Sequence, residues 1–106
     1  MAWTFVLDAE VRAELDALPV DMRASFEHIV RLVQSAGLER VREPHLKHLE
    51  AELWELRLKG KAGIARAIYM TAAGSRIVIL QVFVKKTQKT PRREIELALK
   101  RAREVK

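Results

Sequence analysis

Residues 53–84, LWELRLKGKAGIARAIYMTAAGSRIVILQVFV, decide the fold. Apolar and polar residues alternate in 53–58, which is the period of a β-strand with one buried face. Residues 63–70 predict a second strand, with an arginine at its middle. Residues 76–84 are apolar on both faces, so this strand is expected at the centre of the sheet. The short turns between the three strands predict an antiparallel meander.

The residues before this stretch predict a strand and two helices. Residues 3–7 are aromatic and β-branched, which is typical of a short strand. Asp8 can cap a helix that begins at Ala9. Asp21 can cap a second helix, which should end at Gly37 because glycine is a common C-terminal stop.

Two further segments complete the predicted fold. Residues 38–52 have no clear period, although Pro44 allows a short helical turn to begin there. Thr90 can cap a last helix that has Pro91 at its first position. We therefore predict one domain over residues 1–106 with a two-layer α+β fold. Its order is β-α-α-β-β-β-α, and the helices should cover one face of an antiparallel sheet.

Composition limits the classes of function. The 106 residues are 49% hydrophobic, which is enough for one small core. There is no cysteine, which excludes a disulfide framework and thiolate metal sites. The start, MAWTFVLDAE, lacks the basic region of a signal peptide, and the longest apolar stretch is too short to span a bilayer. We expect a soluble, cytoplasmic protein.

Charge is unevenly distributed along the chain. Residues 1–52 hold six basic and ten acidic residues, a net charge of −4, whereas residues 53–106 hold fourteen basic and four acidic residues, a net charge of +10. A half-chain this positive favours a polyanionic partner, with nucleic acid or the ribosome first among them. The alternative is a basic surface that is merely solvated.

Four basic side chains form the candidate site. Arg57 alternates with the apolar residues of its strand, so it should face away from the helices. Arg66 is a guanidinium in the middle of a strand, where a charge needs a partner or an open groove. Lys85 and Lys86 follow the end of the central strand. Together with the N-terminus of the last helix, these cations would bind phosphate well.

The same basic residues could instead have purely structural roles. Arg66 could pair with Glu55 across adjacent strands as a structural ion pair. Lys85 and Lys86 could be an ordinary solvated strand end.

Further basic and aromatic side chains also have two interpretations. Arg92 and Arg93 lie in the first turn of the last helix, where cations are unfavourable, and this placement favours an external anion. The aromatic residues Trp3, Trp54, Tyr69 and Phe83 are expected in the core, although the last two could stack on bases.

The sequence predicts neither a metal nor a cofactor. His45, His48 and Glu52 could lie together on one helical turn, but a fourth ligand is lacking. The serines have no supporting histidine and carboxylate, and no phosphate-binding GxxxxGK[ST] loop is present.

The pieces LWELR, the arginine on the next strand, FVKKTQKTP and EIELALKRA, in this order over residues 52–102, resemble the HigB branch of the RelE-type toxins, including its phage-derived members. The resemblance implies a toxin of a type II toxin–antitoxin pair. Such toxins enter the ribosomal A site and cut mRNA there without a metal. The implied protein partner is a small helix-turn-helix antitoxin.

The resemblance also implies roles for the basic residues. Arg66 matches the arginine expected to hold the scissile phosphate. Arg57 would stabilise charge near the 2′-hydroxyl, and Lys85 and Lys86 would contact phosphate and assist the leaving group. Further RNA contacts are expected from Lys59, Lys61, Lys89, Arg92 and Arg93.

The sequence departs from the family at the acid–base groups. Some related toxins use a tyrosine or histidine near the C-terminus, but residues 86–106 contain neither. Glu55 is the acidic residue nearest the predicted site. The alternative to an endoribonuclease is a non-catalytic basic module that binds nucleic acid or a partner protein.

Overall fold

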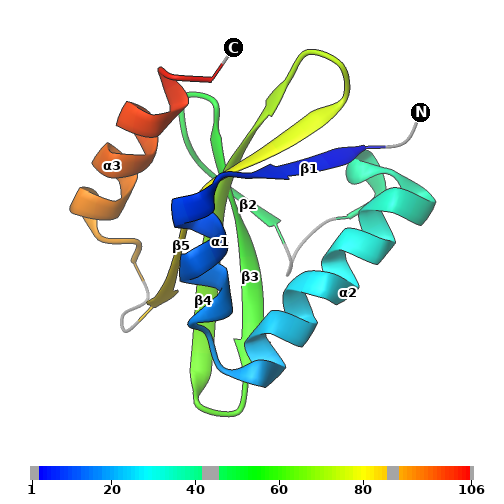
Figure 1. The fold of residues 1–106 in the computed structure, drawn as a ribbon, viewed down its shortest axis with the longest axis vertical. Coiled ribbons are helices and arrows are strands. Elements are labelled where there is room, and N and C mark those ends of the chain that lie inside the picture. The colour runs from blue at the N-terminus through cyan, green and yellow to red at the C-terminus, as the bar shows by residue number, and fades with distance from the viewer. Residues whose placement is uncertain (1–2, 42–45, 86–88, 106) are drawn as a thin grey trace.

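The computed structural model describes residues 3–41, 46–85 and 89–105, with only the main chain of Lys85. The α+β class is confirmed (Figure 1). The elements are β1 (Thr4–Leu7), α1 (Ala9–Asp16), α2 (Val20–Ala36), the 3-10 helix η1 (Leu38–Arg40), β2 (Leu46–Glu50), β3 (Leu53–Gly60), β4 (Gly63–Ala72), β5 (Arg76–Lys85) and α3 (Arg92–Ala102).

One five-stranded sheet has the order β1-β5-β4-β3-β2. The expected meander of β3, β4 and β5 is present, with antiparallel pairing throughout. β1 instead pairs in parallel with β5, from Thr4 opposite Arg76 to Leu7 opposite Ile79, so the sheet is mixed and the purely antiparallel prediction was wrong. Parallel neighbours need a long connection, and here the helices and three strands supply it.

β2 corrects the predicted order. The structure places residues 46–50 in an edge strand that pairs antiparallel with β3, with Leu46 opposite Leu56 and His48 opposite Trp54. A helical turn over these residues was therefore wrong, while Pro44 itself lies outside the described residues. Ala51, at a φ of 50°, turns the chain back into β3. Hydrogen bonding to a long neighbouring strand outweighs the weak local preference of this segment.

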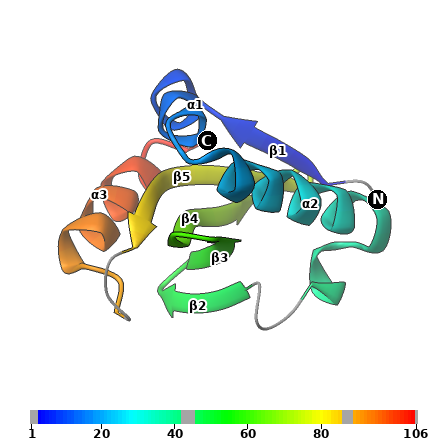
Figure 2. The same ribbon diagram turned by 90° about the horizontal axis from the view of Figure 1, so that it is seen from below.

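Helices cover both faces of the sheet, not one as predicted (Figure 2). α1 and α2 pack on a core that includes Leu56, Leu58 and Ile79, whereas α3 packs on a second cluster that includes Leu53, Ile68 and Leu80. Because β5 is apolar on both faces, each face needs its own cover.

Of the caps predicted for the first two helices, Asp8 is confirmed and Asp21 is not. The Asp8 cap is confirmed, since its Oδ1 accepts the N–H of Val11 at 2.9 Å. Asp21 is not a cap, because α2 begins at Val20, directly after Pro19. The Asp21 carboxylate instead accepts the N–H of Lys61 at 2.7 Å and so ties α2 to the turn between β3 and β4.

Gly60 makes this contact between α2 and the β3–β4 turn possible. A Cβ at this position would lie 2.7 Å from Oδ1 of Asp21 and 2.8 Å from Cγ of Met22. The close approach therefore holds the hairpin, with Lys59 and Lys61 on it, against the start of α2.

Two aromatic predictions have opposite outcomes. Tyr69 is buried, with 2% of its surface exposed. Trp54 is 40% exposed and packs against the ring of His48, so the expectation that it is a core residue was wrong. Its strand is next to the short edge strand β2, which covers only part of the indole. Among the described helices, none has the length and apolar character needed to cross a membrane.

Candidate functional site

Arg57 of β3 and Arg66 of β4 lie directly opposite each other in the sheet. Their chain neighbours Leu56 and Ala65 belong to the core under α1 and α2. Because side chains alternate along a strand, the two arginines lie on the other face, the one partly covered by α3. The structure thus brings together the two arginines that the sequence singled out.

The two guanidiniums differ in burial. Arg66 is only 5% exposed, whereas a quarter of the Arg57 side chain is accessible. Desolvation lowers the pKa of Arg66, while the charge of Glu55 raises this pKa and the charge of Arg57 lowers it. Solvent reaches Arg57 more readily, and Arg66 forms the deeper part of the site.

Glu55 lies beneath both arginines and is fully buried. Its Oε1 lies 3.3 Å from Nε of Arg66 and 4.0 Å from Nε of Arg57. The ion pair between Arg66 and Glu55, which the sequence left as an alternative, is therefore present. One carboxylate faces two guanidiniums, so the group keeps a net positive charge.

Thr90 completes this cluster. Its hydroxyl donates to Oε2 of Glu55 at 2.8 Å, and the residue is 6% exposed. The sequence predicted Thr90 as the cap of the last helix, but α3 begins at Arg92 and no side chain caps it. The threonine hydroxyl is thus committed to the sheet, which corrects that prediction.

Arg66 retains unused donors. Its Nε and Nη1 are buried and make no hydrogen bond within the part of the chain that the structure describes. Buried guanidinium N–H groups without acceptors are costly, so an oxyanion placed beside them would be bound strongly.

The predicted lysines differ in their position along the strands and in how much of each the structure describes. Lys59 and Lys61 are exposed on and beside the end of β3, two and four residues beyond Arg57. Lys89 is exposed just before α3. The main chain of Lys85 pairs with Ile64 at the end of β5. The side chain of Lys85, and all of Lys86, lie outside the described residues.

Arg92 and Arg93 differ from each other. Nη2 of Arg92 donates to Glu50 at 3.2 Å and Nε to Glu96 at 3.3 Å, and these carboxylates raise the pKa of Arg92. Internal carboxylates thus provide the anions that its position in the first turn of α3 calls for. The side chain of Arg93 is 88% exposed, with Glu94 3.8 Å away.

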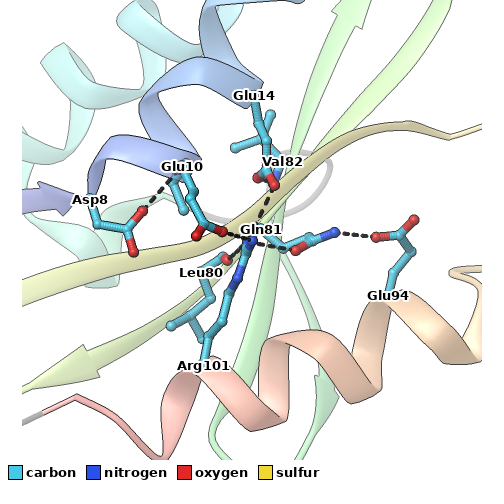
Figure 3. Close-up of polar contacts among 9 residues, drawn as sticks. Asp8, Glu10, Glu14, Leu80, Gln81, Val82, Glu94 and Arg101 are labelled. Carbon is cyan, nitrogen blue, oxygen red and sulfur yellow. Dashed lines mark hydrogen bonds and ion pairs between the residues drawn. The ribbon is translucent and has the colours of Figure 1, made fainter.

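A polar cluster that sequence reasoning missed holds α3 in place (Figure 3). Nη1 of Arg101 donates to the main-chain oxygen of Leu80 and to Oε1 of Gln81, each at 2.7 Å. Gln81 in turn donates to Glu94 in the first turn of α3. The available signal was Gln81 itself, a lone amide within the apolar run VILQVFV.

A groove of about 790 Å³ lies away from the arginines. Its lining includes Val41, Leu46, Trp54 and Tyr69. Tyr69 packs in the core under α1 and α2, so the groove opens on the face opposite to Arg57 and Arg66. The arginine pair and this groove therefore lie at different places on the molecule.

The arginine cluster is suited to binding and stabilising an oxyanion. It combines positive charge, low exposure and guanidinium donors. The described residues contain no cluster of three histidine, aspartate or glutamate side chains that could hold a metal. His48 lies in β2, where successive side chains alternate, so the predicted grouping of histidines on one helical turn was wrong for this residue. His45 lies outside the described residues.

Comparisons with known proteins agree with this fold. Residues 13–103 match the family described as Phage derived protein Gp49-like (DUF891). No curated protein sequence matches the chain.

Two solved structures are similar in fold. One is a double arginine-to-alanine mutant of the E. coli toxin RelE in the free state. It has 16% identity, a TM-score of 0.67 and coverage of 95% of this chain and 98% of that one. The other is the archaeal RelE–RelB complex from Pyrococcus horikoshii, with 19% identity, a TM-score of 0.55 and coverage of 81% and 98%.

Proposed function

The chain is a member of the phage-derived Gp49-like family and has the fold of RelE, and from this premise we propose that it is the toxin of a toxin–antitoxin pair. Its activity is that of a metal-independent endoribonuclease that cuts mRNA on the ribosome and so inhibits translation. The observation that carries this proposal is the pair of facing arginines, Arg57 and Arg66, which share the buried carboxylate of Glu55.

The reaction is an internal transesterification of RNA. The 2′-oxygen bonds to the adjacent phosphorus, the bond from phosphorus to the 5′-oxygen breaks, and a cyclic phosphate and a 5′-hydroxyl result. One proton leaves the 2′-hydroxyl and one reaches the 5′-oxygen. Negative charge grows on the non-bridging oxygens in the transition state, which is where guanidinium donors are most effective.

Each basic residue has its own role in this reaction. Arg66 stabilises the phosphorane through the donors that make no hydrogen bond among the described residues. Arg57, the more exposed of the two, holds the ribose–phosphate beside the 2′-hydroxyl. Lys85 and Lys86 contact phosphate, and a lysine ammonium is suited to protonating the leaving 5′-oxygen.

The flanking RNA follows the exposed cations. We expect four exposed cations to bind phosphates of this RNA: Lys59, Lys61, Lys89 and Arg93. Arg92 contributes less, because Glu50 and Glu96 already hold its guanidinium.

The protein partner is an antitoxin. One structure of similar fold is a RelE–RelB complex, which supports an antitoxin partner for this chain. We propose that this antitoxin is a small helix-turn-helix protein. The toxin and its mRNA substrate meet on the ribosome, in the cytoplasm.

The test is induced expression combined with mapping of mRNA ends on translated messages. Wild type should arrest growth and generate new ends within codons at the A site. Arg57→Ala and Arg66→Ala should each lower the cleavage rate about 100-fold or more. Arg31→Ala, on the exposed side of α2, removes a matched guanidinium and should leave cleavage unchanged. Growth arrest by the Arg57→Ala/Arg66→Ala double variant would contradict the assignment.

The burial of Arg66 favours a second candidate. A guanidinium that is 5% exposed and paired with Glu55 can serve as a structural ion pair beneath a non-catalytic basic surface. That candidate predicts RNA or partner binding that falls steeply with salt, and intact messages even when ribosomes are present.

A further inference from the structure

We propose that Glu55 and Thr90 are positioning residues that set the geometry of the two arginines. The inference deepens the proposed function and rests on it for the identity of the substrate. Neither residue needs to touch RNA. Glu55 acts through Arg57 and Arg66, and Thr90 acts through Glu55.

Glu55 solves an electrostatic problem that the strand register creates. Arg57 and Arg66 are directly opposite each other, and like charges at such positions repel. Glu55 lies on the same face as Arg57, two residues earlier, and its Oε1 reaches the Nε atoms of both arginines. The charge of this one oxygen therefore attracts both guanidiniums, although it forms no hydrogen bond with them in the described structure, and offsets their mutual repulsion.

Thr90 fixes the orientation of the Glu55 carboxylate. Without a second partner, the Glu55 carboxylate could rotate about its side-chain bonds and release either arginine. The Thr90 hydroxyl occupies Oε2 at 2.8 Å, so Oε1 stays directed at the arginines. Both residues are buried, which excludes competing water and strengthens the hydrogen bond.

The location of Thr90 argues against a merely local role. Threonine just before a helix is well suited to capping it, yet no side chain caps α3. The hydroxyl instead crosses to β3, 35 positions away in sequence. The same contact anchors the residue that follows Lys89, so the basic segment before α3 is tied to the arginine pair.

The first experiment compares Thr90→Val with Thr90→Ser in ribosome-dependent cleavage of a defined mRNA. Valine removes the hydroxyl at nearly constant shape, and serine keeps it. We expect kcat to fall about 10- to 100-fold in Thr90→Val with KM changed less than about twofold, and Thr90→Ser to retain activity near wild type. The matched control is Thr71→Val, which should behave as wild type. Thr71 is exposed and lies two residues after Tyr69, on the face of the sheet opposite to Arg57 and Arg66.

The second experiment does not need cleavage. The Nε–Hε resonances of Arg57 and Arg66 are assigned by NMR with Arg57→Lys and Arg66→Lys. Thr90→Val should shift or broaden both resonances, while Thr90→Ser and Thr71→Val leave them in place. Glu55→Gln, which keeps an acceptor for Thr90 but loses the charge, should shift them further than Thr90→Val does.

The two readouts separate the possible failures. Unchanged arginine resonances in folded Thr90→Val would overturn the positioning role, whatever the activity. Absence of cleavage by wild type, with resonances that respond as expected, would overturn the proposed function and leave the positioning intact. An equal loss of activity in Thr90→Val and Thr90→Ser would also count against the hydroxyl. Circular dichroism establishes that each variant is folded.

Discussion

Glu14 of α1 and Arg101 of α3 meet over the edge of β5, with Oε2 and Nη1 3.3 Å apart across 87 positions of sequence. The other oxygen of Glu14 accepts the main-chain N–H of Val82 at 2.9 Å. β1 pairs with β5 only as far as Ile79, so this N–H lies beyond the end of the parallel ladder. A carboxylate thus substitutes for the missing strand and also anchors α3, the helix that covers the arginine site.

Removing Arg101 should destabilise the fold. Arg101→Ala leaves the Gln81 amide, the Leu80 carbonyl and the Glu14 carboxylate with lost partners. We expect the free energy of unfolding to fall by about 2–4 kcal/mol, measured by urea denaturation. Arg103→Ala, at the exposed end of the same helix, is the matched control and should change it by less than about 0.5 kcal/mol. Equal effects of the two variants would show that the cluster is not a stabilising anchor.

The two glutamates of α1 should differ in their contribution. The Glu10 side chain is 78% exposed and pairs with Nη2 of Arg101, whereas the Glu14 side chain is 27% exposed, pairs with Nη1 and also accepts the N–H of Val82. Glu14→Ala should therefore lower the free energy of unfolding by about 1–2 kcal/mol, and Glu10→Ala by less than about 1 kcal/mol. Thermal unfolding of both variants at low and high salt measures the two losses of stability. A larger loss in Glu10→Ala would contradict the role of the β5 edge.

The central meander and its arginines could be predicted because their pattern is local. Alternation in β3 places Arg57 on one face, and the position of Arg66 in the next strand brings the two together once the turn is short. β2 was missed because LKHLE has no alternation and is held mainly by its pairing with β3. The second helical layer could have been expected from β5, since apolar residues on both of its faces require cover.

The remainder of the site depends on contacts between distant residues. Nothing near Thr90 in the sequence indicates that its hydroxyl binds Glu55, and local rules favoured a helix cap. The burial of Arg66 depends on the tertiary packing around it, which no strand pattern specifies. The sequence thus indicated that Arg57 and Arg66 come together and that Glu55 could pair with Arg66, but not that the Thr90 hydroxyl binds this carboxylate.

Arg66 and Glu55 should be strongly coupled in stability. Arg66→Ala leaves a fully buried carboxylate that keeps the Thr90 hydroxyl but has its remaining cation, Arg57, 4.0 Å away, so we expect the free energy of unfolding to fall by about 3 kcal/mol. Arg57→Ala removes the more exposed partner and should cost less than about 1 kcal/mol. In the Arg66→Ala/Glu55→Gln double variant part of the loss should be recovered, since the uncompensated charge is gone.

The measurement for this pair is a double-mutant cycle by urea denaturation. A coupling energy of about 1–3 kcal/mol is expected between Arg66 and Glu55. Additive effects of the two single variants would mean that the 3.3 Å approach contributes nothing to folding. Cleavage should stay low in the double variant even as stability returns, because the guanidinium is still missing.

Stability should fall in alkali because of Tyr69. Burial raises the pKa of this phenol above its ordinary value of 10.0, so the folded state keeps the proton after the unfolded state has lost it. The unfolded state is then favoured as pH rises. The contribution of Tyr69 to the free energy of unfolding is therefore fully present below about pH 10 and is lost above it, with a slope of at most about 1.4 kcal/mol per pH unit.

Tyr69 is the one tyrosine of the chain, so tyrosinate absorbance reports this group alone. It should appear together with unfolding seen by circular dichroism, and Tyr69→Phe should keep its stability to higher pH than wild type. Tyrosinate absorbance at the ordinary pKa in a protein that is still folded would show that the phenol is not buried as the structure places it.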